Sequence, residues 1–336
     1  MTLIYSDAIR RKQLQRTCLR ASDAFRKVLV VTGGAGPERE GSLVSGAHAA
    51  EALRELGFDC AVRDLNELAH GELREHDVAF LAIHGWYGED GKLQGILDLA
   101  GVPYTGSGVA ASAVSMHKPL CNRIAESAGL HVPAWMELND REPLMSQAEG
   151  VFGKLGGQVF VKPTSGGGSI GAGVVTDAAS LRDRVATAAE THGNSMLASR
   201  RVLGTDVTVG LVEVDGQVLV LPPLATYYDS EFYDYTTKHD PELRRHKCPP
   251  RFGEASLEML RQHSTRMFHA VGCRGYARVD FLVDAEELPW FLEINTLPGL
   301  SRLGNLATMA RVLGWSYERL VDHVLSTALR RPGYLP

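Results

Sequence analysis

GYARVDFLVDAEELPWFLEINTLPG, residues 275–299, places four polar side chains on two apolar segments. The segments flank a short acidic turn, DAEELP, as in a β-hairpin. Residues two apart in a strand share a face, so Arg278 lies beside Asp280 on the first strand. By the same rule, Glu293 lies beside Asn295 on the second strand. The stretch therefore predicts a hairpin whose polar groups gather on one face.

The pairing of the two strands decides which polar groups meet. If residue 284 faces residue 289, Asp280 lies opposite Glu293, with Cβ atoms roughly 5 Å apart. The arginine then lies opposite the asparagine. A surface hairpin with scattered polar groups is the alternative, but the bulky apolar residues between them indicate burial, where unpaired charges are costly.

Two carboxylates at this distance repel each other unless a cation lies between them. The oxygens of Asp280, Glu293 and Asn295 suit Mg²⁺, which takes one or two carboxylates together with substrate phosphates. The neighbouring Arg278 is placed to stabilise an anionic oxygen during a reaction. The hairpin therefore predicts a magnesium site that binds a phosphorylated substrate.

A second stretch, QVFVKPTSGGGSIGAGVV at residues 158–175, reads as strand, glycine-rich loop and strand. Glycines leave backbone N–H groups free to surround phosphates, although the loop lacks the Walker A pattern. A flexible hairpin is the alternative. Lys162, at the end of the first strand, favours phosphate binding because a cation beside such a loop is a recurring arrangement. Lys118, in SMHKPL, is a candidate second cation.

The first third of the chain alternates strand and helix patterns. Strands are expected at KVLVVTGG (27–34), DCAVRDL (59–65) and DVAFLAIHG (77–85). A helix is expected over 42–57, with Ser42 as its N-cap and a glycine as its stop. This alternation predicts a parallel α/β sheet.

Two residues of this segment indicate a small-molecule site. Glu38 falls near a strand-to-helix turn, and His84 ends the third strand, where open α/β sheets bind ligands. A glutamate that only caps its own helix is the alternative for Glu38. The nearby GGAGPE does not match a dinucleotide-binding loop, since Pro37 interrupts it.

Composition excludes several classes of function. The chain has 336 residues, 44% of them hydrophobic, and a formal net charge of −5. It therefore has no global electrostatic attraction to nucleic acid or to a membrane surface, and no apolar run reaches the roughly 20 residues that span a bilayer. The five cysteines are scattered, as expected for reduced thiols in a cytoplasmic protein without a disulfide frame or zinc site.

The first 26 residues stand apart from the rest. They are basic and lack the apolar region of a secretory signal. We interpret 1–26 as a flexible extension or the product of an early start codon, with a transit peptide or a partner-binding helix as alternatives.

Motifs spread over most of the chain resemble the D-alanine–D-alanine ligases of the ATP-grasp superfamily. In the family's order and spacing they are GG-x3-EREGSL, HGWYGEDGKLQG, PYTGSGVAASAVSMHK, VKP followed by GGGSIG, FYDYTTKH, GCRGYARVDF and LEINTLPG. The resemblance implies an α/β fold of three domains, with ATP clamped between the central and C-terminal α+β domains. We place the domains at 27–109, 110–200 and 201–336, with the hairpin in the last and a lid loop at about 226–248.

The resemblance also implies a role for each matching residue. For ATP these are the phosphate-holding Lys118, Lys162 and Lys238, the closing loop of Gly166, Gly167 and Ser169, and the ribose-binding acid Asp206. For catalysis and the amino-acid substrates they are Glu38 for the first ammonium group, His84 as pocket lining, Arg278 and the backbone of Gly299 for the oxyanion, and Ser169 beside the substrates. Gly168, His239 and Gly304 stand at family positions around the second substrate without matching the family's residues, and Arg302 lies near them; we count His239 among the candidate catalytic residues. Two Mg²⁺ ions, replaceable by Mn²⁺, would be held by Asp280, Glu293 and Asn295.

The implied reaction has two steps. The carboxylate of the first amino acid attacks the γ-phosphate of ATP, giving an acyl phosphate and ADP. The amine of the second substrate then displaces phosphate and forms a peptide bond. A lid would keep water from the acyl phosphate.

The chain departs from the family pattern near the second substrate. Gly168 replaces a serine and His239 a tyrosine, which in the family form a hydrogen-bonded latch with a glutamate. Gly304 replaces a serine that binds the second carboxylate, with Arg302 as a possible substitute, and Ser199 replaces an acid near the adenine. We therefore predict an altered acceptor, with ordinary cell-wall D-Ala-D-Ala synthesis or depsipeptide formation as alternatives. A histidine near its pKa of about 6.5 would favour a neutral hydroxyl acceptor when protonated.

Other classes of function fit the sequence less well. A non-catalytic nucleotide-binding regulator would not need the intact hairpin and lysines, and a Rossmann oxidoreductase leaves the hairpin unexplained. The family implies amino acids and ATP as small-molecule partners and a cytoplasmic homodimer.

Overall fold

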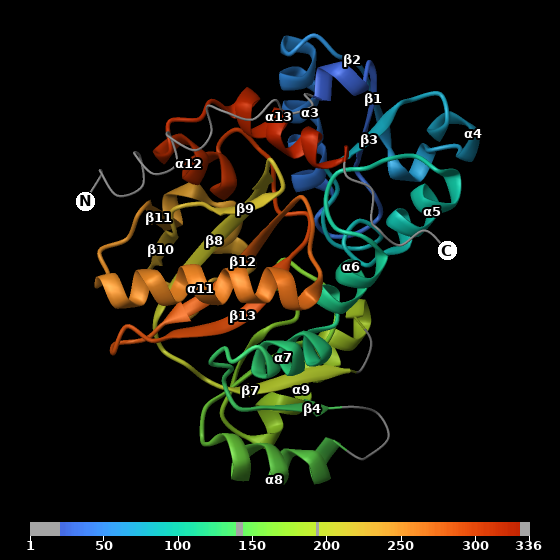
Figure 1. Ribbon diagram of the computed structural model, residues 1–336. Coiled ribbons are helices and arrows are strands. Elements are labelled where there is room, and N and C mark those ends of the chain that lie inside the picture. The colour runs from blue at the N-terminus through green and yellow to red at the C-terminus, as the bar shows by residue number, and fades with distance from the viewer. Residues whose placement is uncertain (1–20, 139–143, 193–194, 330–336) are drawn as a thin grey trace.

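The computed structural model describes residues 21–138, 144–192 and 195–329, which form three sheets with their helices (Figure 1). The first sheet is parallel and has the order β2-β1-β3. Its strands are β1 (Lys27–Thr32), β2 (Asp59–Asp64) and β3 (Val78–Leu81). Its helical segments are α3 (Arg39–Glu55), η1 (Leu65–Glu67), α4 (His70–Leu73) and α5 (Lys92–Ala100). The parallel sheet predicted for this segment is confirmed.

Helix α3 begins three residues earlier than the sequence predicts. Glu38 is its N-cap residue, so the predicted cap at Ser42 is wrong. Ser42 is buried inside the first turns, where its hydroxyl donates to the carbonyl of Glu38 at 3.2 Å and accepts from the amide of His84 at 2.9 Å. The expected stop at Gly57 is confirmed by its left-handed φ of 91°.

The second sheet is antiparallel, with the order β4-β7-β5-β6. Its strands are β4 (Trp135–Leu138), β5 (Val159–Pro163), β6 (Gly173–Val175) and β7 (Met196–Arg200). Helices α8 (Leu144–Leu155) and α9 (Ala178–His192) pack against this sheet and share a hydrophobic core with it. The predicted succession of strand, glycine-rich loop and strand is confirmed by β5 and β6.

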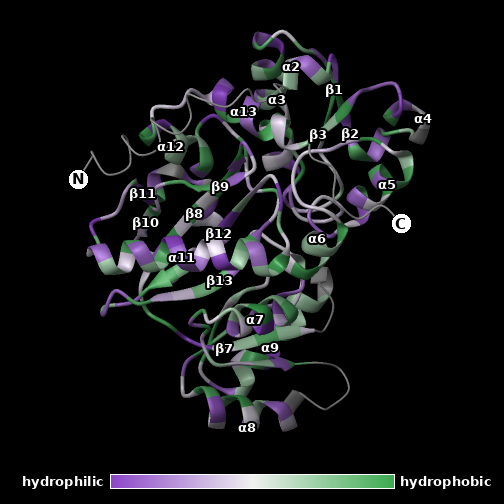
Figure 2. Cartoon of the chain, viewed as in Figure 1, coloured by the Kyte–Doolittle hydropathy of each residue, from purple (hydrophilic) through white to green (hydrophobic). Residues whose placement is uncertain are grey.

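The third sheet is also antiparallel, with the order β11-β10-β8-β12-β13 and β9 paired to β8. Its strands are β8 (Thr205–Val214), β9 (Gln217–Val220), β10 (Leu224–Tyr228), β11 (Arg244–Lys247), β12 (Tyr276–Val283) and β13 (Pro289–Asn295). Helix α11 (Glu254–Val271) covers one face (Figure 1). Hydrophilic and hydrophobic residues alternate along α11 (Figure 2), because one side packs on the sheet and the other faces solvent.

The short connection between β10 and β11 contains α10 (Tyr235–His239) and η2 (Pro241–Leu243). It covers most of the predicted lid, 226–248. Asp234 caps α10 by accepting the amide of Thr237 at 2.7 Å.

Segments distant in sequence complete the hydrophobic cores. Helices α6 (Val109–Met116) and α7 (Lys118–Ser127) share the core of the third sheet, although they fall within the predicted central domain, 110–200. Helices α12 (Asn305–Val312) and α13 (Tyr317–Thr327) share the core of the first sheet. Helix α13 lies beside α3 (Figure 1). The division into three domains stays a prediction, because the cores do not follow its boundaries.

Part of the predicted flexible extension belongs to this first core. Helix α2 (Ala21–Ala24) packs against α13, and Ala21 and Phe25 are buried. The expectation of a flexible segment through residue 26 is therefore wrong from residue 21 onward, because these apolar side chains find a partner near the other end of the chain. Residues 1–20 lie outside the described part. Within that part, no helix combines the length and apolar character needed to cross a bilayer.

Candidate functional site

The hairpin of β12 and β13 brings the four predicted polar groups together. Asp280 pairs with Glu293 and Arg278 with Asn295, as predicted. Buried and partly buried residues alternate along β12, with the apolar set under α11 and the polar set on the other face. The strand alternation therefore turns Arg278 and Asp280 toward the second sheet.

The turn register differs from the prediction by one residue. Val283, not residue 284, faces Pro289, and the register shifts between Asp280 and Phe281. The shift leaves Leu292 without a pairing partner, as in a β-bulge. Without this extra residue the turn register would place Asp280 opposite Leu292 and turn the glutamate to the other face. The bulge therefore brings the two carboxylates together.

Asp280 accepts hydrogen bonds at both carboxylate oxygens. Arg278 donates from Nε at 2.8 Å and from Nη2 at 2.7 Å. Thr208 on β8 donates at 2.5 Å and Asn295 at 3.1 Å. These four donors fill the acceptor sites of the carboxylate. They fix its orientation at the edge of a cavity.

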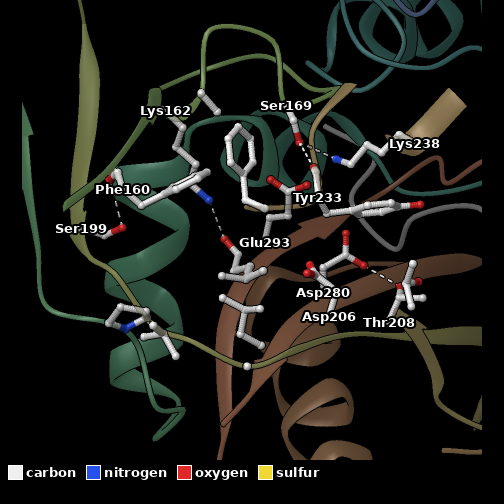
Figure 3. A pocket seen from close by; sticks show the side chains of 18 of the residues that line it. Phe160, Lys162, Ser169, Ser199, Asp206, Thr208, Tyr233, Lys238, Asp280 and Glu293 are labelled. Carbon is white, nitrogen blue, oxygen red and sulfur yellow. Dashed lines mark hydrogen bonds between the residues drawn. The ribbon is translucent and has the colours of Figure 1, made fainter. Parts of the chain in front are cut away.

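Glu293 is an anion among cations. Burial alone would raise its pKa, but the charges of Lys162, Lys118, Lys238 and Arg278 outweigh this and lower the pKa to about 2. Lys162 comes from the β5 side of the cavity and Lys238 from the opposite side (Figure 3). Glu293 shares this set of basic groups with Asp280, which pairs with Arg278.

The lysines are held by backbone and loop groups rather than by salt bridges. Lys118 donates to the carbonyl of Gly166 at 2.6 Å, and burial lowers its pKa to about 8. Lys162 donates at 3.2 Å to the carbonyl of Leu292, the bulged residue, and burial likewise lowers its pKa. Ammonium groups buried in this way gain from an anionic ligand. The arrangement suits a polyphosphate.

The glycine-rich loop and the predicted lid contact each other. The hydroxyl of Ser169 donates to the carbonyl of Tyr233 at 3.1 Å and accepts from Nζ of Lys238 at 2.7 Å. Ser169 has a left-handed φ of 61°, which sets the turn of the loop at this contact. Loop and lid thus form one wall of the cavity.

This cavity has a volume of about 370 Å³ between the second and third sheets. It gathers most of the predicted ATP and metal residues. The predicted residues that line it are Lys118, Lys162, Gly166, Gly167, Gly168, Ser169, Ser199, Asp206, Lys238, Arg278, Asp280 and Glu293. Phe160 and Phe232 meet edge to face at 5.4 Å on its lining. Basic groups at one part and aromatic rings at another suit a nucleotide.

Glu38 lies beside this cavity, between two glycines. A Cβ on Gly167 would lie 2.5 Å from Oε2 of Glu38, and a Cβ on Gly85 would clash with the same atom. Glycine at both positions therefore lets two loops close over the carboxylate. Burial raises the pKa of Glu38, and the charge of Lys238 opposes this rise.

A second buried carboxylate, Glu89, is not among the predicted site residues. It accepts from the amide of Gly85 at 2.8 Å and from the amide of Leu297 at 3.1 Å. It therefore ties the loop after β3 to the loop after β13. Burial and the nearby Glu38 raise the pKa of Glu89 to about 8. Its motif, HGWYGEDG, was a signal in the sequence, but nothing in the spacing indicated which loops it joins.

His84 joins the same two loops. Nδ1 lies 2.7 Å from the carbonyl of Leu297, which can only accept, so Nδ1 carries the proton. Nε2 then accepts from the hydroxyl of Ser45 at 2.9 Å, and Ser45 in turn accepts from the amide of Leu300. Burial lowers the pKa of His84 to about 4, which keeps the imidazole neutral.

This network predicts a pH dependence of stability. His84 binds a proton in the unfolded chain below its ordinary pKa of about 6.5, but in the folded chain only near pH 4. The contribution of His84 to stability is therefore lost as the pH falls from about 6.5 to 4. We expect His84→Asn to lose less thermal stability over this range than the natural protein, measured as melting temperature against pH. Equal slopes would contradict the assignment. His263 and His323, whose pKa values burial also lowers to about 4, add to the slope in both proteins, and Glu89, whose pKa burial raises to about 8, opposes it in both.

Arg302 is placed away from the second-substrate role. Its guanidinium lies 3.3 Å from Glu51, 3.4 Å from Glu55 and 2.5 Å from Glu318, and it stacks over Tyr317. Three carboxylates already neutralise it on the surface formed by α3 and α13. The structure therefore contradicts the prediction that Arg302 binds the acceptor carboxylate.

The remaining predicted residues are glycines and a histidine. Gly304 is the N-cap of α12, and a Cβ there would lie 3.0 Å from Oγ of Ser301, a side chain that can rotate, and 3.2 Å from its carbonyl oxygen. A Cβ on Gly299 would meet nothing within 4 Å, so any role of this residue rests on its backbone. The side chain of His239 lies outside the described residues.

The oxygen donors of the hairpin fit the predicted magnesium. Within the described residues, no three His, Cys, Asp or Glu side chains are grouped to hold a metal ion. Two carboxylates, Asp280 and Glu293, meet here with the amide of Asn295 beside them. Mg²⁺ takes one or two carboxylates and completes its shell with phosphates and water. The residues suit such an ion by type. Because four donors already occupy the lone pairs of Asp280, an ion that arrives with a nucleotide would have to replace at least one of these hydrogen bonds.

The chain is similar to known proteins over most of its length. Two family models match, "D-ala D-ala ligase N-terminus" at residues 61–107 and "D-ala D-ala ligase C-terminus" at residues 124–326. The D-alanine–D-alanine ligase of Desulforudis audaxviator is 37% identical over 308 residues, which cover 91% of this chain and 99% of that protein. The D-alanine–D-alanine ligase of Anaeromyxobacter sp. is 38% identical over 307 residues, covering 90% and 97%. The D-alanine–D-alanine ligase of Bacillus anthracis, solved with ATP, superimposes with a TM-score of 0.77 at 28% identity, covering 90% of this chain and 97% of that one.

Proposed function

Because this chain belongs to the D-alanine–D-alanine ligase family of ADP-forming ligases, we propose that it joins two molecules of D-alanine at the expense of ATP. One observation carries the proposal: a paired aspartate and glutamate, three lysines and a glycine-rich loop converge on a single cavity next to Glu38. The cavity suits the nucleotide, and Glu38 marks where the amino acid enters.

The nucleotide half of the site follows from charge. Lys118, Lys162 and Lys238 would hold the phosphates, and the amides of the loop would close over them. Asp280, Glu293 and Asn295 would hold two Mg²⁺ ions, which when bound neutralise the developing charge on the transferred phosphoryl group. Mn²⁺ would replace Mg²⁺ in this oxygen site.

The amino-acid half follows from burial. The carboxylate of Glu38 would accept the ammonium group of the first D-alanine, with His84 and Glu89 holding the surrounding loops in place. The substrate carboxylate oxygen attacks the γ-phosphorus, and the bond to the β,γ-bridging oxygen breaks to release ADP. The second amine then attacks the acyl carbon, loses a proton and expels phosphate.

Two groups would stabilise the tetrahedral oxyanion of the second step. Arg278 lies on the cavity face of β12, fixed by its two hydrogen bonds to Asp280. The backbone of Gly299 lies in the loop that His84 and Glu89 hold. Fixed donors of this kind lower the barrier because they need no reorientation during the reaction. The segment 226–248 would act as the lid that excludes water.

A different acceptor is the second candidate, favoured by one position. Gly168 has a left-handed φ of 69°, and a Cβ there would meet Glu38 only at 3.7 Å, so the missing serine hydroxyl leaves space beside that glutamate. A hydroxy acid or a larger D-amino acid could use this space.

Product analysis distinguishes the two candidates. We expect purified protein with ATP, Mg²⁺ and D-alanine to release ADP, phosphate and D-alanyl-D-alanine in equal amounts, and no ADP without the amino acid. A panel of D-amino acids and D-hydroxy acids, each competing with D-alanine, is read by mass spectrometry of the products. If a competitor is incorporated faster than D-alanine from pH 6 to 9, that competitor, and not D-alanine, is the acceptor. If the rate of ATP hydrolysis does not depend on any amino acid, the ligase assignment is wrong. The homodimer and the cytoplasmic location stay predictions.

A further inference from the structure

Asp206, the predicted ribose-binding acid, has a partner that the sequence did not reveal. The hydroxyl of Tyr228 donates to Oδ2 of Asp206, while the side chain of Asp206 lines the cavity. Among the described residues, the other oxygen, Oδ1, accepts no hydrogen bond. One oxygen is therefore fixed by protein, and the other is available to a ligand.

Strand geometry explains this contact. Asp206 on β8 pairs with Thr226 on β10, and Tyr228 lies two residues further along β10 on the same face. Diagonal neighbours in an antiparallel pair are within reach of a long aromatic side chain. A tyrosine at 228 therefore meets the acid as a direct result of the sheet register.

The ring of Tyr228 contacts the lid. It stacks on Tyr233 with ring centres 5.4 Å apart and an angle of 13° between the planes. The carbonyl of Tyr233 accepts from Ser169 in the glycine-rich loop, and Lys238 lies over its ring at 5.3 Å. Tyr228 is thus the link between the acid on the sheet and the segment that covers the phosphates.

We propose that Tyr228 is a positioning residue for the nucleotide sugar: its hydroxyl holds Asp206 so that Oδ1 accepts a ribose hydroxyl, and its ring couples sugar binding to the placement of the lid. This proposal depends on one part of the proposed function, the binding of ATP in the cavity. It names the ribose hydroxyls, rather than the base or the phosphates, as the groups that Tyr228 helps to select.

Burial supports this role. Burial raises the pKa of Asp206 to about 6, and the hydrogen bond from Tyr228 opposes the rise. A carboxylate without that donor would be more readily protonated and would be free to rotate. Loss of the hydroxyl should therefore weaken sugar recognition while leaving the phosphate contacts in place.

Two substitutions separate the hydroxyl from the ring. Tyr228→Phe removes the donor and keeps the stacking, whereas Tyr228→Leu removes both. Tyr227→Phe is the matched control, because Tyr227 is a half-exposed neighbour on the opposite face of the same strand. ATP, 2′-deoxy-ATP and 3′-deoxy-ATP are compared at saturating D-alanine by ADP release, and nucleotide binding is measured by calorimetry without amino acid.

We expect Tyr228→Phe to raise KM for ATP about tenfold, the size of a lost hydrogen bond to a charged group, with kcat changed less than twofold. The deoxynucleotide that lacks the bound hydroxyl should show little further loss in this variant, since it already lacks the contact. Tyr228→Leu should also lower kcat, because the lid loses its stacking partner. An unchanged KM for ATP, or equal losses with all three nucleotides, would overturn the proposal.

Calorimetry keeps this result separate from the proposed function. If the natural protein binds ATP but ligates no amino acid, the ligase proposal fails while the ribose comparison still tests Tyr228. If the natural protein ligates D-alanine and the variants bind all nucleotides alike, only the inference about Tyr228 fails.

Discussion

Replacing Glu293 with glutamine is expected to reduce kcat by about 10²- to 10³-fold, the usual cost of losing a fixed charge at a reacting phosphoryl or acyl group. Glutamine keeps the size of the side chain but removes the anion that faces Lys162 and Lys118. The lysines are then left near each other without compensation, so the melting temperature of the free protein should fall as well. Phosphate release against Mg²⁺ concentration is the measurement, and a higher Mg²⁺ requirement is expected.

A matched control separates site chemistry from loss of charge in general. Glu286→Gln changes an exposed carboxylate in the turn of the same hairpin. This variant should keep the activity and the Mg²⁺ dependence of the natural protein. If Glu293→Gln retained full activity at limiting Mg²⁺, the metal assignment would not stand.

Replacing Lys162 with methionine should have the second largest effect. Its ammonium group is buried in the cavity and donates to the carbonyl of Leu292. Removing one phosphate-holding cation should lower kcat/KM for ATP by about 10²-fold, through contacts made to the transferring phosphate. The measurement is steady-state ADP release over a range of ATP concentrations.

Stability should fall together with activity in this variant, as it does in Glu293→Gln. Of the charges that lower the pKa of Glu293, that of Lys162 contributes most, so its removal leaves a buried carboxylate less compensated. Burial also lowers the pKa of Lys162, so methionine removes a desolvation cost and the fall in melting temperature should be partly offset. Lys154→Met, which changes an exposed lysine at the end of α8, is the control and should alter neither quantity. An unchanged kcat/KM for ATP in the Lys162→Met protein would contradict the phosphate role of this lysine.

Strand alternation was enough to predict which polar groups share a face of the hairpin. Asp280 and Glu293 met as expected, although the turn register was off by one residue. A bulge at Leu292 restored the pairing, and bulges leave little trace in the pattern of apolar residues. The sequence therefore predicts which residues face each other across the hairpin. It does not predict the bulge, nor that the carbonyl of the bulged residue accepts a hydrogen bond from Lys162.

Contacts between distant segments were beyond the reach of sequence patterns. Arg302 follows a glycine-containing loop near the site, yet its guanidinium binds Glu318 and the outer face of α3. Tyr228 contacts Asp206 because β8 and β10 pair in a register that places the two residues diagonally on one face. In both cases the local residues allow several partners, and only the packing of whole elements selects one.

The first sheet shares its core with helices from the opposite end of the chain, and this has a consequence during synthesis. Residues 297–328 can reach the core that begins at Ala21 only after the second and third sheets have been synthesised. Domains usually fold in order of synthesis, but here the strands of the first sheet keep an apolar side uncovered until α12 and α13 have been synthesised. The first sheet of the nascent protein therefore cannot complete its core on its own.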